Sequence, residues 1–136
     1  MWDRQATPRP TPVWMRVGVS TSFGWMRTTW RYLNASNAVF HAAFDPLGIR
    51  MYGTLGNHES APANLFFPKS VNEDGTGWLY GATADHWASW LPDAALETLR
   101  ASGFYVVRSV PGAPGLRIIS LNNNFCYKLN FWLYMN

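Results

Sequence analysis

The tetrapeptide Gly56-Asn57-His58-Glu59 contains the side chains of this sequence that are best suited to chemistry. The Asn57 amide oxygen is a hard, neutral donor that suits divalent metal ions and does not titrate. The His58 imidazole can accept or donate a proton near neutral pH. Asn57 is therefore a candidate metal ligand and His58 a candidate proton donor. The alternative is an ordinary loop with a hydrogen-bonding asparagine and a surface histidine.

The residues around the tetrapeptide predict a strand that ends at a loop. An apolar run at 49–55 precedes it, and polar, proline-containing residues follow at 60–64. Catalytic groups often lie at such places, because a sheet fixes the backbone while the loop exposes side chains. We expect a helix at 28–44 to pack beside this strand. Its apolar stripe recurs at helical spacing: Trp30, Leu33, Ala38, His41 and Phe44.

The second half of the chain predicts two short helices and a hairpin. The helices are expected at 82–90 and 93–102, with Gly103 as the C-terminal stop of the second. Residues 104–109 and 116–121 are rich in β-branched and aromatic side chains and read as strands. Proline and glycine between them favour an antiparallel connection. Helices and strands together predict an α/β fold.

Several other polar and aromatic residues have two interpretations each. His41 is predicted to be a satisfied core histidine rather than a ligand, and His86 an exposed structural residue rather than a metal ligand. Trp87 and Trp90 are expected to pack in the core, although an aromatic pair could instead grip a choline headgroup. The asparagines at 122–124 either cap a loop or line the edge of a metal cleft.

Composition bounds the class of protein. The chain has 136 residues, 48% of them apolar, which fits one domain with a real core. Its net charge of +3 is scattered, so no nucleic-acid partner is predicted. No apolar run is long enough for a transmembrane segment, and Met1 is not followed by the apolar region of a signal peptide. The single cysteine, Cys126, has no partner for an internal disulfide.

Further sequence blocks accompany the tetrapeptide in a distinctive order. They are Gly56-Asn57-His58-Glu59-Ser60, Trp78-Leu79-Tyr80, Trp90-Leu91-Pro92, Gly103-Phe104-Tyr105, residues 114–122, Asn124-Phe125-Cys126 and Asn130-Phe131-Trp132-Leu133. In order and spacing these blocks resemble the acid sphingomyelinases, a branch of the calcineurin-like metallophosphoesterases. The resemblance covers residues 51–136 and extends more weakly over 30–50.

The resemblance carries expectations about fold, activity and site. It implies part of an α/β sandwich of two mixed sheets flanked by helices. It implies hydrolysis of sphingomyelin to ceramide and phosphocholine at two Zn²⁺ ions, with Asn57 as a ligand to one ion and His58 protonating the leaving alkoxide. It also implies a lipid surface as partner, a lysosomal or extracellular location, and a cysteine farther along that pairs with Cys126.

The family uses five sequence blocks for its metal centre, and only Gly-Asn-His-Glu occurs here. We therefore expect a central fragment, with residues 1–26 irregular or unrelated and 27–136 a partial metallophosphoesterase domain. One amide oxygen cannot replace the several ligands of a bound Zn²⁺, so the chain alone should be inactive and bind no stoichiometric zinc. Two alternatives are a phosphodiesterase for nucleotides or other phosphodiesters, and a non-catalytic truncated or spliced product.

Overall fold

The computed structural model describes residues 26–68 and 75–134 of the chain. Its first element is the long helix α1, Met26–Phe44. The helix ends in a single 3-10 turn, Asp45–Leu47, after which Gly48 takes a left-handed φ of 66°. Pro46 cannot continue the helical hydrogen bonds and Gly48 adopts the left-handed conformation without strain, so the predicted stop is confirmed. The predicted irregular segment at 1–26 lies outside the described residues, apart from Met26.

The buried side of α1 differs from the predicted stripe. Leu33 and Asn37 are buried and Phe40 and Phe44 are half-buried, at alternating four- and three-residue spacing along one face. Trp30 is 42% exposed, and its ring approaches Trp78 with the centroids 6.0 Å apart. A polar residue, Asn37, therefore occupies the inner face of α1, while the predicted member Trp30 lies toward its edge.

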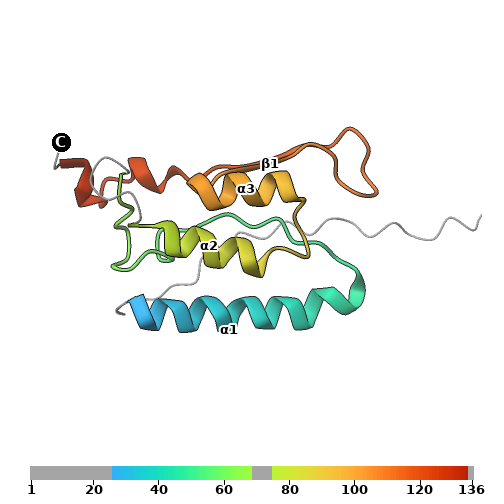
Figure 1. Ribbon diagram of the computed structural model, residues 1–136, viewed down its shortest axis with the longest axis horizontal. Helices are drawn as coiled ribbons and strands as arrows, with labels where there is room; N and C mark the ends of the chain where they lie inside the picture. The colour runs from blue at the N-terminus through green and yellow to red at the C-terminus, as the bar shows by residue number, and fades with distance from the viewer. Residues whose placement is uncertain (1–25, 69–74, 135–136) are drawn as a thin grey trace, which may run out of the picture.

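Two short helices cover the middle of the molecule. Helix α2, Gly77–His86, packs against α1 and against α3, Asp93–Ser102 (Figure 1). Helix α3 matches its predicted bounds, and Gly103 ends it with φ 73°. The predicted helix at 82–90 is wrong in position, because α2 begins five residues earlier and ends before Trp87. Burial of Leu79, Ala82, Thr83 and Ala84 outweighs the low helix propensity of the two glycines in α2.

The sheet is a two-stranded antiparallel hairpin that packs on α3. Strands β1, Tyr105–Val107, and β2, Ile118–Ser120, pair with Val106 opposite Ile119. Tyr105, Val107, Ile118 and Ser120 face the core, whereas Val106 and Ile119 are exposed. The predicted hairpin is confirmed, and the chain is a mixed α/β structure. The two-sheet sandwich stays a prediction.

In the part of the chain that the structure describes, the buried apolar side chains form two clusters. The larger one includes Met51, Trp87, Trp90, Leu99 and Tyr105, which confirms core packing for both tryptophans. The smaller one joins residues of α1, α2 and the segment around the tetrapeptide: Leu33, Leu55, Phe66, Leu79, Tyr80 and Ala82. Among the described residues, no helix combines the length and the apolar character that a membrane crossing requires.

Candidate functional site

The tetrapeptide follows a buried segment, but that segment is not a strand. Met51, Tyr52, Gly53 and Leu55 are buried, and no strand is assigned between residues 49 and 68. The predicted strand at 49–55 is therefore wrong. Side chains of the hairpin bind this segment instead of a strand ladder: Gly53 O accepts from Tyr105 Oη at 2.7 Å and from Ser120 Oγ at 3.2 Å. Thr54 Oγ1 donates to Leu121 O at 3.1 Å.

Gly53 fits this position because the indole of Trp87 lies against it. A Cβ built on Gly53 would lie 2.7 Å from two ring atoms of Trp87. The ring is rigid and 6% exposed, so it has little room to give way. The segment that leads to the tetrapeptide is thus fixed by close packing against Trp87 and by hydrogen bonds from two hydroxyl groups.

Asn57 and His58 are both half-buried and lie in a turn. Asn57 Nδ2 donates to Asn64 Oδ1 at 2.7 Å, and Asn64 N donates to Asn57 O at 2.7 Å. These two bonds close the loop across seven residues, with Asn64 at a positive φ of 70°. The side-chain bond uses the NH₂ group of Asn57, so its oxygen, the atom that would ligate a metal, is not the atom that binds Asn64.

The two residues after His58 turn into the protein. Glu59 is 6% exposed and Ser60 is 2% exposed, and Ser60 Oγ donates to Pro62 O at 2.9 Å. The tetrapeptide therefore presents its amide and its imidazole closer to the surface than its carboxylate. Asn57 and His58 are thus less buried than Glu59 and Ser60, which belong to the base of the loop.

A chain of buried asparagines lies directly behind this loop. Asn122 is 2% exposed, and its Oδ1 accepts from Asn124 N and Asn124 Nδ2 at 3.2 and 2.8 Å. Asn122 Nδ2 donates to Tyr80 Oη at 3.3 Å, and burial raises the pKa of that phenol. The interpretation of residues 122–124 as loop caps is supported, since Asn122 is the N-cap of the 3-10 turn Asn123–Cys126.

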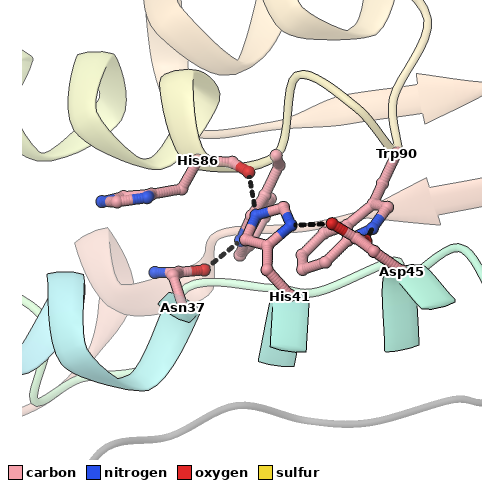
Figure 2. Close-up of polar contacts among 6 residues, drawn as sticks. Asn37, His41, Asp45, His86 and Trp90 are labelled. Carbon is pink, nitrogen blue, oxygen red and sulfur yellow. Dashed lines mark hydrogen bonds and ion pairs between the residues drawn. The ribbon is translucent and has the colours of Figure 1, made fainter. Parts of the chain in front are cut away.

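The other two histidines belong to a separate network between α1 and α2 (Figure 2). His41 Nδ1 lies 2.7 Å from Asp45 Oδ2, and its Nε2 lies 2.7 Å from the His86 carbonyl oxygen. Trp90 Nε1 donates to Asp45 Oδ1 at 2.7 Å, and the His41 ring stacks on Trp90 at 4.0 Å. Hydrogen bonds from His41 and from Trp90 hold the pKa of the Asp45 carboxyl below its usual value of 3.8.

His86 completes this network through its ring. His86 Nε2 lies 2.7 Å from Asn34 Oδ1. Burial, and next the charge of His41, lower the pKa of His86 below 6.5, while Asp85 opposes them. His86 is half-buried rather than exposed as predicted, and its contacts are structural. Both histidines connect helices, and no group of His, Cys, Asp and Glu in the described residues brings either of them together with His58 as a possible metal site.

The donor set near the tetrapeptide does not fit a bound metal ion by itself. Within residues 26–68 and 75–134, no three His, Cys, Asp or Glu side chains come together in a way that could hold one. A catalytic Zn²⁺ usually takes three protein ligands, and a single amide oxygen is a weak substitute. No step of chemistry through a metal can therefore be built on these residues alone.

Comparison with known proteins shows sequence similarity to sphingomyelin phosphodiesterases. The chain is 44% identical to the human sphingomyelin phosphodiesterase over 114 residues, which are 82% of this chain and 18% of the human protein. It is 48% identical to the sphingomyelin phosphodiesterase of Bos taurus over 89 residues, 65% of this chain and 14% of that protein. The chain is homologous to a segment of the sphingomyelin phosphodiesterases.

The homology also reaches related phosphodiesterases. The mouse cyclic GMP-AMP phosphodiesterase is 39% identical over 82 residues, 60% of this chain and 17% of that protein. No protein-family model matches the chain. Because this chain spans less than a fifth of the sphingomyelin phosphodiesterases it matches, their activities describe proteins several times longer.

Proposed function

We propose that this chain forms the part of a sphingomyelin phosphodiesterase that contributes one amide and one imidazole to the cleavage of a phosphodiester. The reaction would convert sphingomyelin to ceramide and phosphocholine. The supporting observation is the homology to sphingomyelin phosphodiesterases together with a loop in which Asn57 and His58 are half-buried above a buried base. The lipid surface and the lysosomal or extracellular location expected from the resemblance belong to the same proposal.

His58 has the clearer chemical task. In hydrolysis, water oxygen bonds to phosphorus, the bond from phosphorus to the ceramide oxygen breaks, and the departing alkoxide takes a proton. A protonated imidazole at that oxygen supplies this proton, a contribution typically of about 10²–10⁴-fold in rate. Asn57 would offer its oxygen to one of two Zn²⁺ ions. The remaining ligands would come from outside this chain, so the chain alone is proposed to be inactive and free of bound zinc.

A segment-replacement experiment tests the proposal. The 114 residues of the human sphingomyelin phosphodiesterase that match this chain are replaced by the corresponding residues of this chain, and sphingomyelin hydrolysis is measured. We expect the chimera to be active and His58→Gln to lower kcat by about 10²–10⁴-fold. His86→Gln, a histidine of the helix network, serves as the matched control and should retain activity. A folded chimera without activity would refute the proposal.

The isolated chain provides the complementary measurement. Purified 136-residue protein should hydrolyse no sphingomyelin and should contain no stoichiometric zinc by elemental analysis. Two tightly bound zinc ions would contradict the proposal that this chain lacks the other metal ligands.

A nucleotide phosphodiester is the second candidate substrate. The observation that favours it is the 39% identity to the mouse cyclic GMP-AMP phosphodiesterase over 60% of this chain. Sphingomyelin and a cyclic dinucleotide, offered to the natural protein that contains this segment, would distinguish the two substrates. Hydrolysis of the cyclic dinucleotide with no hydrolysis of sphingomyelin would select the second.

A further inference from the structure

Both ends of the loop that carries Asn57 and His58 are bound by buried asparagine amides. Asn124 Nδ2 donates to the carbonyl oxygen of Leu55, the second residue before Asn57, at 3.2 Å. Asn130 Nδ2 donates to the carbonyl oxygen of Phe66, the second residue after Asn64, at 2.9 Å. Asn124 is 6% exposed and Asn130 is 0% exposed. Both come from the part of the chain that follows β2.

The hydrogen-bonding chemistry fixes the orientation of both amides. A backbone carbonyl only accepts, so each asparagine must turn its NH₂ group toward the loop. The second N–H of Asn124 donates to Asn122 Oδ1 at 2.8 Å, which leaves its amide little freedom to flip. Asn122 is in turn anchored on Tyr80 of α2. A continuous chain of amides therefore runs from α2 to the base of the loop.

The packing around these bonds is consistent with a fixed position for the loop base. Leu55 and Phe66 belong to the same buried cluster, and the Phe125 ring meets Phe66 edge-on at 6.1 Å. The buried carbonyl groups of Leu55 and Phe66 would lower the stability of the folded state if no donor formed a hydrogen bond with them. The asparagines satisfy that requirement at the two points where the loop leaves and re-enters the core.

We infer that Asn124 and Asn130 are positioning residues, which hold the loop of residues 56–65 so that Asn57 and His58 are presented in one geometry. Neither acts on substrate directly. The catalytic part of the inference rests on the proposed function. A proton donor must lie close to the leaving oxygen, and a loop that is fixed at both ends keeps it there. Misplacement by about 1 Å can cost about 10²-fold in rate.

The loop position can be tested in the 136-residue chain without any activity. Asn124→Asp and Asn130→Asp are nearly isosteric and place a carboxylate oxygen where an N–H donor is needed. We expect amide exchange at Asn64 and Leu65, whose N–H groups donate within the loop to Asn57 O and Pro62 O, to accelerate about tenfold. The imidazole resonances of His58 should shift as well. Asn123→Asp introduces the same charge at an exposed neighbour and should change neither.

The exchange rate of a backbone amide outside the loop distinguishes a local change in the loop from destabilisation of the whole fold. The N–H of Leu91 donates to Trp87 O at 3.0 Å, away from the asparagines, and its exchange should stay unchanged in the same variants. Equal acceleration at Leu91 and Asn64, with unshifted His58 resonances, would assign the asparagines a general structural role and overturn the inference. If the variants do not fold, side-chain amide exchange in the unmodified chain tests the inference. The side-chain amide protons of Asn124 and Asn130 should then exchange more slowly than those of Asn123, and equal rates would overturn the inference.

Steady-state kinetics of the chimera with the human enzyme test whether the position of the loop affects catalysis. Asn124→Asp should lower kcat by about 10–100-fold with little change in KM, because a misplaced proton donor affects the chemical step. A rise in KM alone would contradict positioning. An inactive parent chimera would refute the proposed function, while the exchange and resonance measurements would still decide whether the asparagines position the loop.

Discussion

Two polar networks link the elements of this protein, and they differ in the kind of group that makes the bonds. The network between α1 and α2 uses ionisable side chains, His41, Asp45 and His86, near the surface (Figure 2). The network behind the candidate loop uses neutral amides, Asn122, Asn124 and Asn130, each at most 6% exposed. Neutral amides keep their hydrogen bonds at any physiological pH, whereas the histidine network changes with protonation.

The difference suits the tasks of the two networks. A loop that presents a proton donor benefits from supporting side chains whose own charge does not change with pH. The helix interface has no such restriction, and its bonds are reinforced by aromatic stacking of His41 on Trp90 and by the bond from Trp87 Nε1 to Asn37 Oδ1 at 2.9 Å. Breaking one network at a time tests whether they are energetically separate.

Removal of Asn122 should have the largest effect. Asn122→Ala deletes two accepted bonds and one donated bond at a site 2% exposed, and it leaves Tyr80 Oη and Asn124 without those partners. We expect the free energy of unfolding to fall by about 2–4 kcal/mol. Urea unfolding followed by tryptophan fluorescence measures this. Asn123→Ala, at the exposed neighbour, should stay within about 0.5 kcal/mol.

Acid should weaken the histidine network next. The folded protein lowers the pKa of His86 below 6.5, so the unfolded chain binds more protons between the lowered value and 6.5. The contribution of His86 to stability is therefore complete above pH 6.5 and is lost as pH falls through the lowered pKa. Asp45, whose pKa is lowered from 3.8, loses its contribution in the same direction at more acidic pH.

Unfolding measured between pH 5 and pH 7.5 should show this dependence. The charges of His41 and Asp85 act on His86, and both residues have partners of their own, Asp45 for His41 and Arg100 for Asp85. Only His86 is changed in the test variant. His86→Gln keeps a side-chain donor for Asn34 and should flatten the pH dependence. Asn122→Ala should be less stable by the same amount at each pH. A steeper slope in that variant would mean that the two networks are coupled.

The sequence predicted those parts of the molecule whose signals are local. Pro46 and Gly48 end α1 through their own backbone preferences, and Gly103 does the same for α3. The turn at Asn57 and His58 also lies where the predicted loop begins. These features need no information about distant residues.

The remaining features depend on partners that the local sequence does not identify. The apolar residues 49–55 predicted a strand, but side chains of Tyr105 and Ser120 bind Gly53, and no strand of the described chain pairs with it. The predicted helix extended to Trp90 because Trp87 and Trp90 continue the apolar pattern. Helix α2 ends at His86, and both tryptophans pack in the core from the connection that follows it. The contact of Asn130 with Phe66 O could not be predicted, since a single asparagine before an apolar segment does not indicate which carbonyl it will meet.

The smallest effect is expected at an exposed ion pair beside the histidine network. Arg100 Nη2 lies 2.6 Å from Asp85 Oδ1, with the side chains 46% and 70% exposed. Asp85→Asn should lower the free energy of unfolding by less than about 1 kcal/mol, because water screens the pair and both side chains lose freedom in forming it. The difference should shrink further in 1 M NaCl, where charges interact over only about 3 Å. A loss as large as that of Asn122→Ala would show that the surface charges, rather than the buried amides, dominate the joining of these elements.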